Sequence, residues 1–190
     1  MPEAKRFSRL MVPRPAGHDQ NRRTHPDHHH ALLGAAAVAA VISSLITRPP
    51  YLLVWNSSSS VPPGLYWIEH SGKIRRGEFV LAWLAHPQRE IADERRYLPA
   101  NVPIIKQVAG VAGDRACGTG TMLRIGRSVA VRRLRADPAG RGLPWWNGCR
   151  KLSADEVMLL GWSKLSFDGR YFGPIRLEDI EGRAVPVWTR

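Results

Sequence analysis

Apolar residues form one long unbroken run in this chain, and several short runs follow it. The long run, Ala31 to Ile46, reads ALLGAAAVAAVISSLI. Only residues 89–98 have a weak helical pattern, and glycine, proline and aspartate gather between the short runs. Seven of the short runs have the length and composition of strands: residues 51–55, 64–69, 78–83, 102–108, 122–125, 129–131 and 156–160. The pattern predicts a mainly β domain with antiparallel mixed sheets or a partial barrel.

The long apolar run predicts one transmembrane helix over residues 31–47. Its 16 residues would rise about 24 Å as a helix, slightly less than a hydrocarbon core of ~30 Å, and bilayers tolerate such a mismatch. A cleaved signal peptide is the main alternative, but the Ala-Val-Ala at Ala37–Ala39 lies inside the run and no similar site follows it before Arg48. A buried helix is disfavoured because the run is apolar on all sides.

The segments that flank this run differ in character. Residues 1–30 are polar and proline-rich, with six lysines and arginines against three acidic residues, which predicts a disordered basic tail. Arg22 and Arg23 favour a cytoplasmic location for this tail. We interpret the histidines of this tail as a polar flank of the apolar run rather than as a metal site, because no neighbouring segment supplies a rigid frame for metal ligands. Residues 48–190 form the predicted folded domain, on the periplasmic or exterior side of the membrane.

Composition narrows the classes of function. Hydrophobic residues make up 44% of the chain, enough for a buried core. The net charge of +12 suits nucleic acid or an anionic membrane. The basic residues are spread over the whole chain, so nucleic-acid binding is disfavoured. The two cysteines, Cys117 and Cys149, are too few for a zinc site, and the compartment decides whether they pair.

Four consecutive serines, Ser57 to Ser60, raise the question of nucleophilic chemistry. A serine hydroxyl needs a neighbouring base, and neither histidine of the predicted domain, His70 or His86, lies in a triad-like setting. A lysine kept neutral by apolar burial is the other solution. Lys106 fits because it lies in the apolar stretch NVPIIKQVAG. The plainer alternatives are a serine linker and a lysine at a strand edge.

Three separated motifs resemble those of the type I signal peptidases, in particular the TraF-type conjugative transfer signal peptidases. The first is SVPPGLY at Ser60–Tyr66, similar to the nucleophile box. The second is KQVAGVAGD at Lys106–Asp114, similar to the lysine box. The third is SFDGRYFG at Ser166–Gly173, similar to the last conserved box. With the apolar segment before them, the motifs stand in the order that the family has.

The resemblance implies a role for each matching residue. Ser60 matches the nucleophile and Lys106 the general base, while the Ser60 N–H and the Ser58 hydroxyl match the donors to the oxyanion. Ser166 matches a serine that orients the lysine. Two further residues, Asp168 and Arg170, match a pair that braces the region beside the site. The chain departs from the family pattern at Val61, where methionine is usual, and at Gly169, where serine is usual.

The register within the serine run favours Ser60 over Ser59. Ser59 also has a proline three positions later, at Pro62. With Ser59 as nucleophile, however, Leu65 and Tyr66 would fall one position out of the family pattern.

A peptidase of this kind works outside the cytoplasm, so the resemblance also places Cys117 and Cys149 in a compartment where they could form a disulfide. The loop between them contains Trp145 and Trp146. Contact with the membrane or substrate and packing in the core remain equal alternatives for these tryptophans.

The resemblance implies the function of a membrane-anchored serine endopeptidase that processes exported precursor proteins, in particular the pilin precursor of a conjugative transfer system. The expected partners are the precursor and membrane lipid, without nucleic acid, metal or cofactor. A general signal peptidase is the alternative within enzymes. An inactive envelope scaffold and a cytosolic self-cleaving repressor are alternatives of other classes.

Overall fold

The computed structural model describes residues 28–46 and 50–190, so the basic tail predicted for residues 1–30 lies almost wholly outside the described residues. The chain divides into two compact units, Met1–Arg48 and Pro49–Arg190. The first contains the helix α1 (His28–Ile46), whose apolar side chains from Leu32 to Ile42 are exposed. In the described part of the chain, no helix has both the length and the apolar character needed to cross a membrane.

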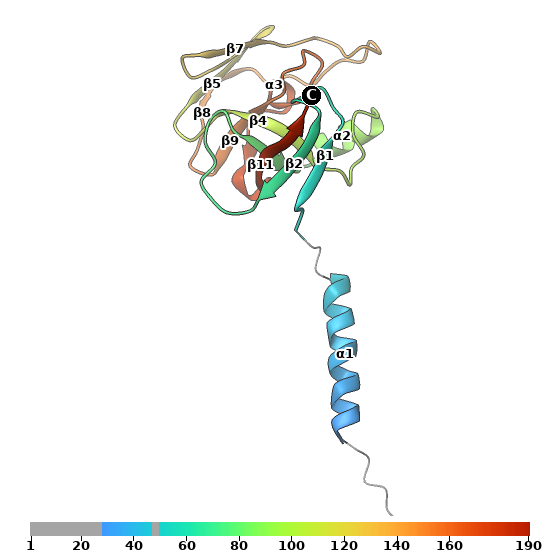
Figure 1. The fold of residues 1–190 in the computed structure, drawn as a ribbon. Helices are drawn as coiled ribbons and strands as arrows, with labels where there is room; N and C mark the ends of the chain where they lie inside the picture. The colour runs from blue at the N-terminus through green and yellow to red at the C-terminus, as the bar shows by residue number, and fades with distance from the viewer. Residues whose placement is uncertain (1–27, 47–49) are drawn as a thin grey trace, which may run out of the picture. The chain divides into compact units, whose positions relative to one another are not determined.

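The second unit consists of two antiparallel sheets (Figure 1). The larger sheet has seven strands in the order β1-β2-β11-β3-β4-β9-β10, and the smaller has four in the order β7-β6-β5-β8. The larger sheet contains β1 (Leu53–Asn56), β2 (Gly64–Glu69), β3 (Phe79–Ala82), β4 (Ile104–Gly110), β9 (Glu156–Leu160), β10 (Ile175–Arg176) and β11 (Ile180–Thr189). The smaller contains β5 (Arg115–Thr119), β6 (Met122–Ile125), β7 (Val129–Arg132) and β8 (Gly148–Lys151). The prediction of a mainly β domain with antiparallel sheets is confirmed.

Helical structure in this unit is limited to short segments: α2 (Gln88–Glu94), α3 (Gly169–Phe172) and a 3₁₀ turn at Leu177–Asp179. Each predicted strand overlaps an observed one. The predicted helix over residues 89–98 ends early, because Arg95 caps α2 and Arg96 has a φ of 57°. Strands β5, β8, β10 and β11 had not been predicted.

Strand β4 shows how the sheet positions a lysine in the core. Side chains two residues apart on a strand share a face, so Lys106 lies in one row with Ile104 and Val108. Both of these neighbours belong to a buried apolar cluster that includes Leu84 and Leu159. Lys106 therefore points from the middle of the sheet into largely apolar surroundings.

The smaller sheet contains a disulfide bond between Cys117 of β5 and Cys149 of β8, which are directly opposite in register. Trp145 and Trp146 precede β8 and are half-buried. Trp146 packs against the core cluster of this sheet, and its indole N–H donates to the carbonyl of Gly169 at 3.1 Å. The structure thus favours core packing for Trp146.

Candidate active site

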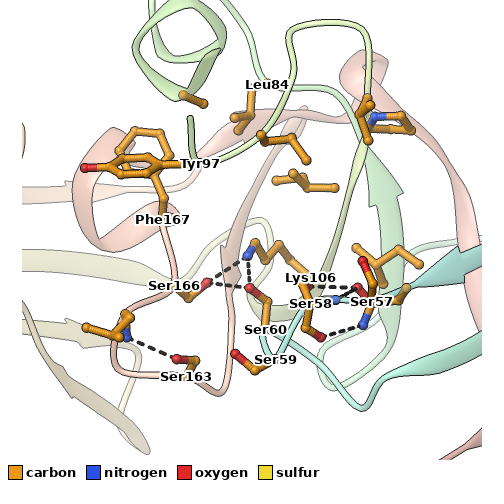
Figure 2. A pocket seen from close by; sticks show the side chains of 18 of the residues that line it. Ser57, Ser58, Ser59, Ser60, Leu84, Tyr97, Lys106, Ser163, Ser166 and Phe167 are labelled. Carbon is orange, nitrogen blue, oxygen red and sulfur yellow. Dashed lines mark hydrogen bonds between the residues drawn. The ribbon is translucent and has the colours of Figure 1, made fainter. Parts of the chain in front are cut away.

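A cavity of about 830 Å³ opens beside the serine run. Three segments far apart in the sequence meet at its floor: the loop after β1, strand β4, and the loop between β9 and α3 (Figure 2). They contribute Ser60, Lys106 and Ser166 in turn. The opposite wall comes from α2 and the residues after it, and from the loop of residues 134–143. Most of the lining side chains in that wall are apolar or aromatic.

The side chains of Ser60, Lys106 and Ser166 contact one another directly. Lys106 Nζ lies 2.6 Å from Ser60 Oγ and 2.7 Å from Ser166 Oγ, and the two hydroxyl oxygens are 3.1 Å apart. All three residues are buried, and Lys106 is only 5% exposed. The structure therefore brings together the three residues that the family motifs predicted to form the reacting group.

Burial changes the acid–base character of Lys106. Desolvation of the ammonium group lowers the pKa of Lys106 to about 8, because the charged form loses its hydration. The negative charge of Asp168 opposes this effect and the positive charge of Arg170 adds to it. Lys106 thus loses its proton near pH 8, much closer to neutral pH than an exposed lysine does, and a lowered pKa is what a lysine that activates a serine requires.

Asp168 and Arg170 form a buried ion pair behind the site. Arg170 Nε donates to Asp168 Oδ1 at 2.9 Å and Arg170 Nη2 donates to Asp168 Oδ2 at 2.6 Å. The pair also holds the loop before Ser166, because Asp168 accepts the N–H of Gly161 and Arg170 donates to the carbonyls of Gly161 and Ser163. The N–H of Trp162 in the same loop donates to the carbonyl of Ser60 at 2.6 Å. A chain of contacts thus connects the pair to Ser60.

Loss of this ion pair should destabilise the domain. Asp168 is 0% exposed, so Arg170→Met would leave a buried carboxylate without its partner and lower the unfolding free energy by about 3–5 kcal/mol. Urea unfolding at pH 7 measures the change. The control, Arg176→Met, removes an exposed arginine paired with Glu178 and should behave like wild type. Equal stability of the two variants would contradict this role of the pair.

The other serines of the run are exposed. Ser58 Oγ donates to Asn56 Oδ1 at 2.8 Å. The Ser59 side chain makes no hydrogen bond to any residue that the structure describes. Contact with Lys106 is therefore made by Ser60, the serine that the motif register favours, and not by Ser59.

Two glycines of the site allow very close packing, and sequence reasoning missed the importance of both. A Cβ atom at Gly161 would lie 2.2 Å from Ser166 Oγ and 3.1 Å from Ser60 Cβ. A Cβ at Gly169 would lie 2.5 Å from Met158 Sδ and 2.7 Å from the carbonyl oxygen of Leu159. Gly169 is the position at which the sequence departs from the serine of the family pattern. The glycine instead permits tight packing of α3 on β9.

Gly161→Ala should lower the catalytic rate by about 100-fold, because a displacement of about 1 Å at reacting groups has an effect of this size. The new methyl group would push Ser166 or Ser60 away from Lys106. Initial rates of peptide cleavage measure the loss. Gly142→Ala is the matched control, because a Cβ there would meet no atom within 4 Å. A Gly161→Ala enzyme as fast as the control would show that the site tolerates the methyl group.

The sequence matches one family model and is similar to individual proteins of Escherichia coli. Residues 27–189 match the family model described as signal peptidase, peptidase S26. Two Escherichia coli proteins, each described as plasmid transfer protein TraF, are 31% and 33% identical to the chain over 147 residues. Each similarity covers 70% of this chain and 81% of the relative. The family match spans all three segments that meet at Lys106.

Proposed function

Because this chain belongs to the signal peptidase family, peptidase S26, we propose that it is a serine endopeptidase with Ser60 as nucleophile and Lys106 as general base. The observation that carries the proposal is the 2.6 Å contact between Lys106 Nζ and Ser60 Oγ, made by a lysine whose burial lowers its pKa to about 8. A serine next to such a base has what nucleophilic catalysis needs. An inactive scaffold would have no use for this arrangement.

The reaction proceeds through an acyl-enzyme. Neutral Lys106 takes the proton of Ser60 as Oγ attacks the substrate carbonyl carbon, and the tetrahedral oxyanion is held by the Ser60 N–H and the Ser58 hydroxyl. Lys106 then gives the proton to the leaving amine as the peptide bond breaks. In the second half, Lys106 activates a water molecule that releases the acyl group. Ser166 keeps the Lys106 amine directed at Ser60.

The substrate is an extended precursor segment that follows a transmembrane stretch, with small side chains at P1 and P3. It lies in the cavity beside β1, an edge strand of the larger sheet, where an added strand can pair with the backbone. Membership of the family and similarity to plasmid transfer proteins support an exported precursor of a conjugative transfer system. The pilin precursor is the substrate proposed.

In this proposal residues 31–47 serve as a membrane anchor although α1 does not have both the length and the apolar character of a spanning helix, with the N-terminus in the cytoplasm and the catalytic domain in the periplasm. The unbroken apolar sequence Ala31–Ile46 supports this, as do the family's exported substrates and the disulfide of the smaller sheet. After alkaline carbonate washing, the full chain should stay with the membrane pellet. A chain that starts at residue 50 should be released.

Co-expression with the pilin precursor of a conjugative system tests the function. The precursor should be shortened only when the enzyme is present. Mass spectrometry of the product distinguishes hydrolysis from acyl transfer to an internal amine, because the transfer product is lighter than the hydrolysis product by one water. A secreted protein with an ordinary signal peptide serves as the control substrate. Equal cleavage of both substrates would favour a general signal peptidase, and cleavage of neither would favour the scaffold.

A further inference from the structure

Asn56 is the last residue of β1 and has an unusual setting for a polar side chain. It is 7% exposed, whereas the next three residues, Ser57–Ser59, are all exposed. Neither the family motifs nor the reaction described above uses it. Its side chain forms hydrogen bonds with the loop that carries Ser58 and Ser60.

The amide group of Asn56 makes five contacts with this loop. Nδ2 donates to the carbonyls of Ser58 (3.0 Å), Val61 (3.2 Å) and Pro62 (3.2 Å). Oδ1 accepts the N–H of Ser58 (3.1 Å) and its hydroxyl (2.8 Å). Nδ2 has two hydrogens, so at least one is shared among the three carbonyls. An aspartate cannot replace this set, because a carboxylate has no donor for them.

The contact with the Ser58 hydroxyl bears on catalysis. Asn56 Oδ1 can only accept a hydrogen bond, so the single hydroxyl proton of Ser58 is directed at Asn56. The same proton is the one that Ser58 must donate to an oxyanion. The hydroxyl therefore has to leave Asn56 when the tetrahedral intermediate forms.

Asn56 makes this exchange easy. When the Ser58 hydroxyl turns away, Oδ1 keeps the bond from the Ser58 N–H, so no buried acceptor is left without a partner. The hydroxyl exchanges a neutral bond for a stronger one to a charged oxygen. Meanwhile the contacts of Nδ2 with the carbonyls of Ser58, Val61 and Pro62 keep the loop backbone in place. We propose that Asn56 is a positioning residue that holds the Ser58 hydroxyl ready and releases it to the oxyanion, an inference that rests on the proposed Ser/Lys mechanism.

A double-mutant cycle with Ser58 tests this role. It uses the full chain in detergent and an extended peptide with alanine at P1 and P3. Ser58→Ala should lower kcat by roughly 100-fold, as the loss of one oxyanion donor does. Asn56→Asp should lower kcat by about 10-fold or more and leave KM within about 2-fold, because its carboxylate holds the hydroxyl proton more strongly and the effect is confined to the transition state.

The decisive measurement is the double variant. In the Ser58→Ala background, Asn56→Asp should lower kcat by clearly less than it does in the wild-type background, because the part of its effect that acts through the Ser58 hydroxyl is already lost. Losses that multiply would overturn the proposal and leave Asn56 as a support of the loop. An increase in KM without a change in kcat would do the same.

Two controls complete the design. Asn147→Asp makes the same charge change at an exposed position just before β8 and should leave kcat unchanged. If Asn56→Asp does not fold, as judged by circular dichroism, Asn56→Ala takes its place in the cycle. Failure of both variants to fold would overturn the proposal in favour of a structural role. Activity that survives Ser60→Ala would instead refute the proposed function itself, so the two failures are distinguishable.

Discussion

Ser60→Ala is expected to abolish precursor shortening, with a loss in kcat of roughly 10⁴-fold or more, typical of removing a serine nucleophile. Without the hydroxyl, no acyl-enzyme can form, and water would have to attack the substrate directly. Lys106 Nζ contacts Ser60 Oγ and Ser166 Oγ in the structure, and the prediction assigns the nucleophile to Ser60 because Ser166 matches the serine that orients the lysine in the family motif. The fraction of shortened precursor over time, followed by gel electrophoresis, measures the effect.

Ser59→Ala is the matched control, since it removes the neighbouring hydroxyl from the same loop. It should cleave within about 2-fold of wild type, because exposed substitutions away from specific contacts have small effects. Loss of processing in Ser59→Ala together with activity in Ser60→Ala would mean that the register is wrong by one residue. Full activity in both variants would exclude this loop as the source of the nucleophile.

Lys106→Met should have opposite effects on activity and stability. Cleavage should fall about as far as in Ser60→Ala, because the general base is lost. The free energy of unfolding at pH 7 should rise by up to about 3 kcal/mol. The pKa of Lys106 is lowered from 10.5 to about 8 by burial, and each pKa unit corresponds to about 1.4 kcal/mol. Methionine fills a similar volume without a charge.

The lowered pKa of Lys106 also sets the direction in which stability changes with pH. The unfolded chain binds more protons than the folded one between pH 8 and 10.5, so wild-type stability should rise with pH over that range. The stability advantage of Lys106→Met should shrink accordingly. The kcat/KM of the wild type should rise with pH and reach half its maximum near pH 8, where Lys106 becomes neutral.

Chemical denaturation and initial rates between pH 6 and 10 measure both trends. Lys164→Met provides the control, because Lys164 is exposed and close in sequence to Ser166. It should show neither the gain in stability nor the loss of activity. A flat pH–rate profile across pH 8 would contradict the assignment of Lys106 as the base.

The sequence was informative where apolar side chains cluster locally. The strand at residues 64–69 was predicted with the bounds that the structure has, because its apolar and aromatic residues lie together between turn signals. Lys106 could be singled out because its neighbours on the strand are apolar. The signal peptidase family is confirmed by the match over residues 27–189. The catalytic roles of Ser60 and Lys106 stay predictions that the geometry supports.

Features that depend on distant partners could not be read from the sequence. Strand β11 contains Gly182 and Pro186, which weaken any local strand signal. Its pairing with β2 and β3 overrides these residues, with register shifts near both of them. Gly161 looks like an ordinary turn residue until the fold brings Ser166 and Ser60 against it. Asn56 likewise belongs to no motif, because its five hydrogen-bond contacts form only when the fold brings the residues of the loop around it.

The position of β11 affects when the enzyme becomes active. This strand lies between β2, which follows the Ser60 loop, and β3, which pairs with the Lys106 strand. It also comes after every other described strand in chain order. The segments that carry Ser60 and Lys106 therefore belong to parts of the sheet that are joined by the last described strand in chain order. In the proposed enzyme, a chain that still lacks β11 would contain both residues without the strand that joins their parts of the sheet, and we expect it to have no peptidase activity.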